Sequence, residues 1–377
     1  MLYRKFGKTN VEVSALGFGA MRLPIINGKF DNIDEKTTEA MLKYAIENGV
    51  NYVDTAYVYH GGMSEKVVGK ILKKGLRNKV YLATKLPTWM ITERKDMDKY
   101  LNEQLERLQT DHIDFYLVHG LAKDRWNTLE GLGVIEFLEA AKKDGRITHA
   151  GFSYHDEPQN FKDIVDAHDW DFCQTQFNYM DTAYQAGLKG LRYVGTKGMG
   201  LVIMEPLKGG QLTGSVPPAI QKIWDKAEVK RTPAEWGLRY VWDYMEPGVV
   251  LSGMSTLEQV KENVKLADSA KPGSLTKKEK TLIGEVKKKY KTMVAVDCTG
   301  CRYCMPCPSG VDIPGNFNML NNATMFGSAN TMKMVYKMYM PETERASNCA
   351  KCGECEEKCP QHLPIKEKLE EVSKVLC

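Results

Sequence analysis

Residues 80–119 read VYLATKLPTWMITERKDMDKYLNEQLERLQTDHIDFYLVH. Two short apolar runs, 80–85 and 113–119, flank a segment at 97–109 in which apolar residues recur every three or four positions. Short apolar runs of this kind predict buried strands, and the longer period predicts an amphipathic helix. This stretch therefore predicts a strand–helix–strand unit of a parallel sheet.

The same alternation continues through about the first 270 residues. The other predicted strands are SALGFG (14–19), NYVDTA (51–56), HAGFSY (149–154), FCQTQFN (172–178), GLVIMEP (200–206) and GVVLSGM (248–254). Eight strand–helix units in about 260 residues predict an α/β fold, a (β/α)8 TIM barrel. A doubly wound sheet is the alternative. However, no G-x-G-x-x-G motif follows an early strand, so a Rossmann dinucleotide site has no support.

Composition and charge predict a cytoplasmic protein of more than one domain. The chain has 377 residues, 43% of them hydrophobic, and a formal net charge of +4. It opens with MLYRKFG rather than an apolar signal segment, and it contains no run of about 18 uncharged apolar residues. We therefore expect neither a membrane span nor a nucleic-acid partner. We expect three parts: a barrel (1–273), a linking helix (274–296) and a small, mainly α-helical ferredoxin-like domain (297–377).

Cysteine spacing is the reason for expecting that last domain. Eight of the ten cysteines lie in two runs, CTGCRYCMPCP (298–308) and CAKCGECEEKCP (349–360). The second run has the C-x2-C-x2-C-x3-C-P spacing of ferredoxins, and each run can supply four thiolates. The pattern predicts two [4Fe-4S] clusters. Zinc is the alternative, since two C-x2-C pairs can bind it tetrahedrally.

In the ferredoxin spacing, three cysteines bind one cluster while the fourth, which precedes proline, reaches the other. This crossed pattern assigns one cluster to Cys298, Cys301, Cys304 and Cys359, and the second to Cys349, Cys352, Cys355 and Cys307. The first run departs from the pattern, because only Met305 and Pro306 separate its last two cysteines. The assignment of Cys307 is therefore provisional. The methionine-rich segment between the runs predicts helices and resembles the α-helical ferredoxin module of some respiratory oxidoreductases.

Ionisable residues end three of the predicted strands. Asp54 ends the second strand, Lys85 the third and His119 the fourth, and Tyr59 follows Asp54 by five positions. Active sites of (β/α)8 barrels lie at the C-terminal ends of the strands. These four residues are therefore candidates for one site.

The phrases around these residues resemble the aldo/keto reductase superfamily from residue 1 to about residue 270. They include YRKFGKTNVEVSALGFG (3–19), DTAxxY (54–59), ATK (83–85), DFYLVH (114–119), GFS (151–153), QxQFN (174–178), EPLKGG (205–210) and SGMSTLEQVKEN (252–263). The resemblance implies a catalytic tetrad of Asp54, Tyr59, Lys85 and His119. In it the tyrosine would donate a proton to the substrate oxygen, and the lysine ammonium would lower the pKa of the phenol. Asp54 would keep Lys85 charged, and His119 would orient the substrate.

The resemblance also implies a nicotinamide coenzyme. Residues matching the family's coenzyme contacts are Ser153, Gln174, Met204, Ser255, Thr256, Gln259, Glu262 and Asn263. The first three fall near the nicotinamide ring, and Ser255 and Thr256 fall at a helix N-terminus, which favours phosphate. Gln259 stands where relatives specific for NADPH often carry arginine. We expect NADP(H), with NAD(H) as the alternative.

The leading interpretation is an iron–sulfur-containing aldo/keto reductase. Its barrel would carry out NAD(P)H-dependent hydride chemistry on a small-molecule carbonyl or alcohol, coupled to one-electron transfer through the two clusters. Ferredoxin or another electron carrier would be its partner. Two alternatives stay open: a carbonyl reductase whose clusters are purely structural, and a non-catalytic subunit that senses nicotinamide or relays electrons.

Overall fold

The computed structural model describes all residues of the chain except 215, 299, 301 and 360. The chain divides into two compact units. The barrel unit contains Met1–Gly209 and Ala234–Thr276, and the C-terminal unit contains Gly210–Pro233 and Lys277–Cys377. Each unit has its own hydrophobic core.

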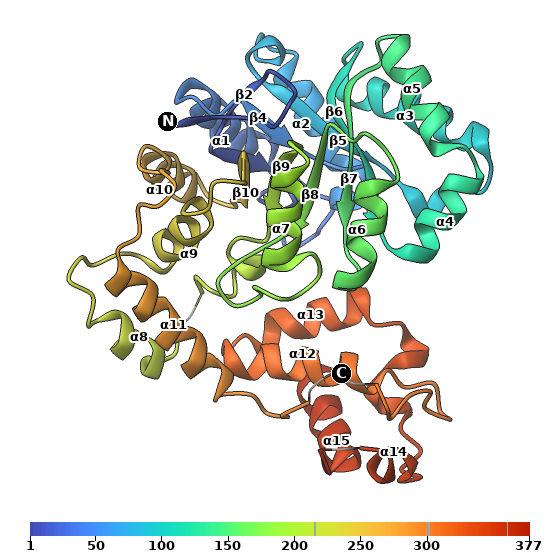
Figure 1. Cartoon of the computed structure of the whole chain (residues 1–377), viewed down its shortest axis with the longest axis vertical. Coiled ribbons are helices and arrows are strands. Elements are labelled where there is room, and N and C mark those ends of the chain that lie inside the picture. Colours follow the sequence, from blue (N-terminus) through green and yellow to red (C-terminus); the bar gives the residue numbers. More distant parts are fainter. Residues whose placement is uncertain (215, 299, 301, 360) are drawn as a thin grey trace. The chain divides into compact units, whose positions relative to one another are not determined.

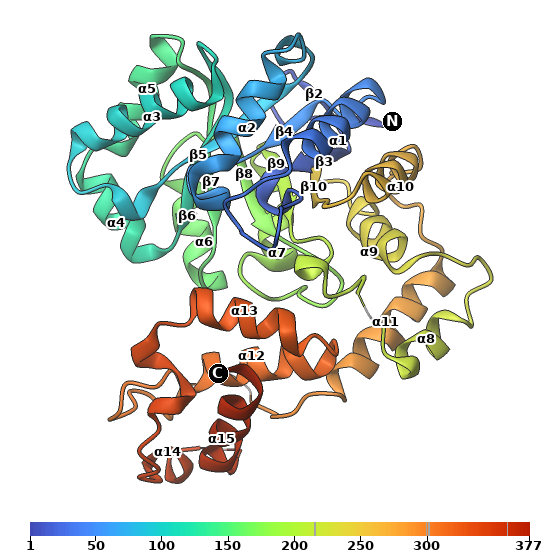
Figure 2. The same ribbon diagram turned by 180° about the vertical axis from the view of Figure 1, so that it is seen from behind.

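The barrel unit is a closed barrel of eight parallel strands, which confirms the predicted fold class (Figures 1 and 2). Neighbouring strands pair in chain order, and the last strand closes the barrel by pairing with the first. The strands are β3 (Leu16–Gly19), β4 (Tyr52–Asp54), β5 (Tyr81–Leu86), β6 (Ile113–Leu121), β7 (Ile147–Tyr154), β8 (Phe172–Gln176), β9 (Gly200–Met204) and β10 (Val249–Gly253).

Helices follow the strands and cover the outside of the barrel (Figure 1). They are α1 (Glu35–Glu47), α2 (Met63–Leu72), α3 (Arg94–Leu108), α4 (Lys123–Gly131), α5 (Val134–Lys143), α6 (Pro158–Asp166), α7 (Gly187–Thr196), α9 (Pro233–Trp242) and α10 (Leu257–Ala267). Local sequence signals set several boundaries. Helix α3 begins with a reciprocal capping box between Glu93 and Asp96 and ends at Gln109, whose φ is +52°.

A short N-terminal hairpin that the sequence did not predict precedes the barrel. Strands β1 (Tyr3–Lys5) and β2 (Glu12–Ser14) form it, and Phe6 lies between them. The Phe6 ring lies 5.1 Å from the ring of Phe115 and 5.8 Å from that of Phe172, in the barrel interior. A Cβ at Gly200 would come within 2.8 Å of the Phe6 ring, so glycine is required where this ring fills the barrel.

The C-terminal unit is mainly helical, as predicted. Its helices are α8 (Pro218–Trp224), α11 (Lys277–Lys291), α12 (Ile313–Met325), α13 (Ala329–Tyr339), α14 (Glu354–Glu357) and α15 (Ile365–Leu376). Phe317, Leu320, Tyr336, Leu369 and Val372 are buried in its core. The Asn316 side chain links α12 to α13 and to the segment before the second cysteine run, because it accepts hydrogen bonds from Tyr336 Oη and from the backbone N–H of Ala346.

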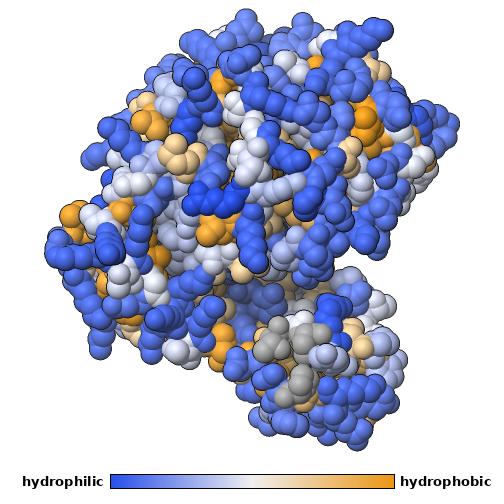
Figure 3. Space-filling view, viewed as in Figure 1, coloured by the Kyte–Doolittle hydropathy of each residue, from blue (hydrophilic) through white to orange (hydrophobic). Residues whose placement is uncertain are grey.

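No helix within the described part of the chain is long and apolar enough to cross a membrane. On the face seen in Figure 3, hydrophilic side chains cover most of the surface, and apolar residues gather only in small groups.

Candidate active site and cysteine-lined cavities

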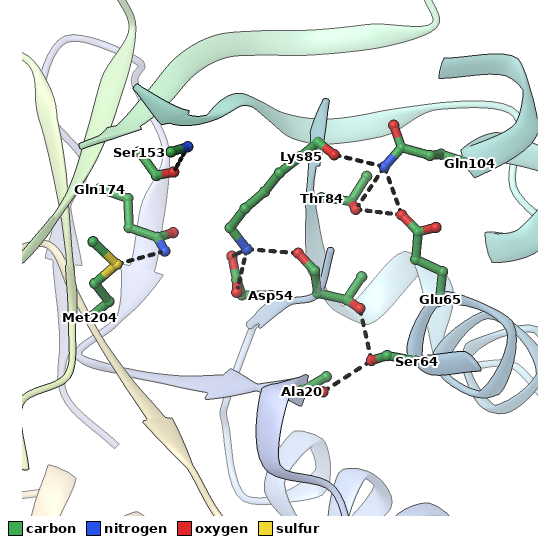
Figure 4. A network of polar contacts seen from close by, with 12 residues as sticks. Ala20, Asp54, Ser64, Glu65, Thr84, Lys85, Gln104, Ser153, Gln174 and Met204 are labelled. Carbon is green, nitrogen blue, oxygen red and sulfur yellow. Dashed lines mark hydrogen bonds and ion pairs between the residues drawn. The ribbon is translucent and has the colours of Figure 1, made fainter. Parts of the chain in front are cut away.

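Lys85 and Asp54 form a buried ion pair at the C-terminal ends of β5 and β4 (Figure 4). Lys85 Nζ donates to both carboxylate oxygens of Asp54 at 2.7 Å and to the backbone oxygen of Thr55 at 2.7 Å. The ammonium group has three N–H donors, so these three acceptors can satisfy it without water. Lys85 is 0% exposed and Asp54 is 3% exposed.

Burial acts against both charges of the pair. It raises the pKa of Asp54 and lowers the pKa of Lys85, and in each case the partner's charge opposes the shift. The short contacts and the complete set of acceptors favour the ionised pair. Lys85 therefore places a fixed positive charge inside the mouth of the barrel.

Tyr59 and His119 lie next to this ion pair. Tyr59 begins the short turn that follows β4 (Tyr59–Gly62), and the centroid of its ring is 5.0 Å from Lys85 Nζ. The rings of Tyr59 and His119 meet edge to face, with their centroids 6.2 Å apart. The structure thus brings all four predicted tetrad residues together from β4, the following turn, β5 and β6.

The imidazole of His119 is held neutral. Burial lowers its pKa well below the usual value, and the positive charge of Lys85 adds to the shift, as do His155 and Arg125. Its Nδ1 atom is buried and has no hydrogen-bond partner among the described residues. A phenol, a fixed cation and a neutral imidazole in one place can protonate, stabilise and orient a carbonyl oxygen.

Three predicted coenzyme residues come together on adjacent strands (Figure 4). Ser153 on β7 is paired in register with Gln174 on β8, and Gln174 Nε2 lies 3.5 Å from the sulfur of Met204 on β9. Ser153 Oγ accepts a hydrogen bond from Gly120 N–H at 2.7 Å and can still donate its own proton. The Oε1 atom of Gln174 is buried without a partner in the described structure. One free acceptor and one available hydroxyl donor fit a carboxamide such as that of nicotinamide.

The other predicted coenzyme residues lie on α10 and just before it. Thr256 caps the helix by accepting from Gln259 N–H at 3.3 Å, and Gln259 Oε1 accepts from Ser255 N–H at 2.8 Å. Asn263 is 5% exposed, and its amide donates to Ser252 Oγ at 3.1 Å, so it braces the helix against β10. Glu262 is half-buried on the same helix. Contacts of these residues with a coenzyme stay predictions.

A second buried carboxylate, Glu65, is 0% exposed on α2 and was not predicted from the sequence. It hydrogen-bonds Thr84, the residue before Lys85, at 2.6 Å. The sequence around Glu65 could have indicated its burial. Glu65, Val68 and Leu72 follow one apolar stripe of the helix, where an acidic residue is out of place unless it has partners.

Two cavities in the C-terminal unit are lined by cysteines from both runs. One cavity is lined by Cys298 and Cys304 of the first run and Cys359 of the second. The other is lined by Cys349, Cys352 and Cys355 of the second run and Cys307 of the first. Cys301, predicted for the first set, lies outside the described residues.

This arrangement follows the crossed pattern for every described cysteine, including Cys307. Among the described residues, no three Cys, His, Asp or Glu side chains converge closely enough to hold a single metal ion. In each cavity, thiols of both runs line one space. Ile313 lines both cavities, so one side chain lies between the two sets of thiols.

Comparison with known families identifies the barrel. Residues 15–278 match the aldo/keto reductase family. The chain belongs to the aldo/keto reductase family. The resemblance read from the sequence is thereby confirmed, as is the expectation of an oxidoreductase.

Relatives of this aldo/keto reductase cover most of the barrel. An L-galactose dehydrogenase from Arabidopsis thaliana is 30% identical over 292 residues, which are 69% of this chain and 86% of the relative. An NADH-specific methylglyoxal reductase from Escherichia coli is 26% identical over 68% of this chain and 91% of its own length. The solved structure of an aldo-keto reductase from Bacillus halodurans in its holo form has a TM-score of 0.64 and 28% identity, over 76% of this chain and 96% of that one.

A second family match covers the cysteine runs. Residues 297–363 match a 4Fe-4S dicluster domain. The chain is therefore an aldo/keto reductase that carries an iron–sulfur domain of the dicluster type at its C-terminal end.

Proposed function

We propose that this aldo/keto reductase couples NAD(P)H-dependent interconversion of a carbonyl and an alcohol to one-electron transfer through two [4Fe-4S] clusters. The observation that carries the proposal is the joint presence of a complete tetrad around Lys85 and two cavities lined by thiols of both runs.

In the reductive direction, NAD(P)H supplies hydride to the carbonyl carbon when it is bound. The carbonyl oxygen then gains negative charge and requires a proton, which Tyr59 is positioned to donate. The Lys85 ammonium, 5.0 Å from the Tyr59 ring, stabilises the phenolate that remains. Asp54 holds the ammonium in place, and neutral His119 orients the oxygen by hydrogen bonding. The reverse sequence oxidises an alcohol.

Ser153, Gln174 and Met204 would hold the nicotinamide end of the coenzyme, and the N-terminus of α10 would hold a phosphate group. The unpartnered Oε1 atom of Gln174 supports the first contact, because an amide N–H would satisfy it. NADP(H) is the proposed coenzyme and NAD(H) is the alternative.

Cys298, Cys301, Cys304 and Cys359 would hold one cluster, and Cys307, Cys349, Cys352 and Cys355 the other. Reduction of the carbonyl takes both electrons of the hydride and leaves NAD(P)+. For the clusters to take part, two electrons from a reduced carrier would pass singly through them and, with one proton, convert NAD(P)+ back to NAD(P)H; two clusters hold that number of electrons one each. The shared wall residue Ile313 supports electron exchange between them, because it keeps the two cavities adjacent. Cys352 is exposed, so the second cavity offers an edge where ferredoxin or another carrier can exchange electrons.

The substrate is proposed to be a small carbonyl compound or the corresponding alcohol. The relatives named for L-galactose and methylglyoxal support a small polar substrate.

An anaerobic titration of the iron-replete protein with NADPH and then NADH, followed by EPR, tests the coupling. We expect a signal of reduced clusters that grows with one coenzyme and identifies it. If dithionite reduces the clusters while both coenzymes leave them oxidised, the coupling is wrong, and the reductase with structural clusters replaces it.

A further inference from the structure

Glu65 belongs to a buried polar network beside the Lys85–Asp54 ion pair (Figure 4). Its Oε1 atom accepts hydrogen bonds from Thr84 Oγ1 at 2.6 Å and from Gln104 Nε2 at 2.7 Å. Its Oε2 atom lies 3.4 Å from a guanidinium nitrogen of Arg107. A carboxylate with no solvent exposure is stable only when its oxygens are satisfied in this way.

One branch of the network fixes the backbone on which Lys85 sits. Thr84 directly precedes Lys85 in β5, and Gln104 Nε2 also donates to the backbone oxygen of Lys85 at 3.0 Å. The other end of the Gln104 amide accepts from Tyr116 Oη at 2.8 Å, which ties the network to β6. The carboxylate of Glu65 thus holds β5 at the residue before Lys85 and, through Gln104, at Lys85 itself.

A second branch supports the segment that carries Tyr59. The guanidinium of Arg107 lies 3.8 Å from the ring centroid of Tyr57, and the same group donates to the Tyr57 backbone oxygen at 3.3 Å. Tyr57 stands two positions before Tyr59. Since Arg107 also faces Glu65, the placement of this segment depends on the same carboxylate.

A third contact reaches Asp54 through the residue beside Glu65. Ser64 Oγ lies 2.9 Å from Thr55 Oγ1 and donates to the backbone oxygen of Ala20 at 3.0 Å. Thr55 follows Asp54, and its backbone oxygen is one of the three acceptors of Lys85. The start of α2 is therefore attached to the segments that carry three of the four tetrad residues.

On the basis of the proposed function, we infer that Glu65 is a positioning residue for the reaction, fixing Lys85 and the Tyr59 segment in their reactive arrangement. It touches neither substrate nor coenzyme in this role and acts through Thr84, Gln104 and Arg107.

The charge of Glu65 also contributes to the electrostatics of the site. Burial raises the pKa of Glu65, and the hydrogen bonds from Thr84 and Gln104 and the charge of Arg107 oppose that shift. Its negative charge acts on Lys85 in the same direction as that of Asp54, favouring the ammonium. The titratable and charged groups around Glu65 and Lys85 include Asp54 on β4, Tyr57 and Tyr59 after it, Glu103 and Arg107 on α3, Tyr116 and His119 on β6, and His155 after β7.

The test compares Glu65→Gln with Glu103→Gln in the iron-replete full-length protein, using a carbonyl substrate that the wild type reduces. Glu103 is a matched control, because it also contacts Arg107 and Tyr57 but is 35% exposed at the edge of the network. For E65Q we expect kcat to fall by about tenfold to a hundredfold with KM within about twofold. We expect the basic limb of the kcat/KM profile to move to lower pH by about half a unit or more, because the charge of Glu65 raises the pKa of Lys85 and its loss lowers that pKa.

For E103Q we expect wild-type kcat within about twofold and an unmoved basic limb. A folded E65Q variant with wild-type kcat and pH profile would overturn the inference. If E65Q does not fold, Thr84→Val is used, which keeps the charge and removes one donor; a wild-type kcat in T84V would overturn it as well. The Tyr59→Phe variant distinguishes failure of the proposed function from failure of the role of Glu65. Retained activity in Y59F contradicts the proposed function, whereas an inactive Y59F with an unaffected E65Q contradicts only the role of Glu65.

Discussion

Lys85 Nζ and the Asp54 carboxylate are bonded through both carboxylate oxygens, at 2.7 Å each, in a place almost closed to solvent. Removing two charges from water costs more free energy than most ion pairs return, so such a pair is weak evidence for stability. In the proposed function, its position beside the rings of Tyr59 and His119 explains why the chain keeps it. There the pair would keep a cation close to the substrate oxygen, and the fold would bear its cost for that reason.

Replacing Lys85 by Met should abolish carbonyl reduction and lower the free energy of unfolding by about 3–5 kcal/mol, because Asp54 is left buried without its partner. Burial alone then raises the pKa of Asp54, so its folded form binds a proton more tightly than the unfolded chain does. The penalty should therefore be largest at pH 8 and shrink as the pH falls. Urea unfolding of the barrel, followed by tryptophan fluorescence at pH 5 and pH 8, measures both effects.

The double variant Asp54→Asn/Lys85→Met is the control for that measurement. It removes both charges, so most of the lost stability should return while the protein stays inactive. A double variant as unstable as K85M would mean that packing, and not the uncompensated carboxylate, causes the loss.

The activity should show no inflection from His119 near pH 6.5. Burial, followed by the charge of Lys85, lowers the pKa of this imidazole well below its usual value, so the ring stays neutral from about pH 6 upward. The same shift means that the unfolded chain binds the proton more tightly, so the contribution of His119 to stability falls as the pH drops below about 6.5. A kcat/KM profile between pH 5.5 and 8 checks the first point. An inflection near 6.5 that disappears in His119→Gln would contradict it.

Paired cysteine substitutions should reveal the crossed ligand sets. Cys298→Ala/Cys359→Ala alters only the first cavity, although the two residues lie in different runs, and should retain about half of the iron. Cys298→Ala/Cys307→Ala alters both cavities, although the two residues lie in one run, and should lose nearly all of it. Iron analysis and visible absorption of the anaerobically purified proteins give the answer. If Cys298→Ala/Cys359→Ala loses nearly all of the iron while Cys298→Ala/Cys307→Ala keeps about half, each run holds its own cluster.

Replacing Gln174 by Leu should weaken coenzyme binding about five- to tenfold, the effect of one lost hydrogen bond. The free energy of unfolding should not fall, because the change removes a buried oxygen that has no partner within the described structure. Fluorescence titration with NADPH and NADH measures the first effect, and thermal unfolding without coenzyme is the control. Unchanged affinity for both coenzymes would remove Gln174 from the proposed contacts.

Local sequence patterns predicted most of the barrel. Each of the predicted strands overlaps a strand of the structure, although β6 continues to Leu121 and the run 14–19 is divided between β2 and β3. The hairpin before the barrel was missed because each of its strands has only three residues, too few to show a period. The burial of Phe6 depends on rings that are distant in sequence, such as Phe115 and Phe172.

The sequence by itself determined the order of strands and helices, the strand ends that carry Asp54, Lys85 and His119, and the two cysteine runs, because these features are local. Only the tertiary structure decided which of these residues contact one another. Lys85 contacts Asp54 from a neighbouring strand, and Glu65 is linked to Lys85 through Gln104 on another helix. Cys359 and Cys298 line the same cavity although helices separate their runs in the sequence. Such contacts follow from barrel closure, strand register and helix packing, which no periodicity within a single segment specifies.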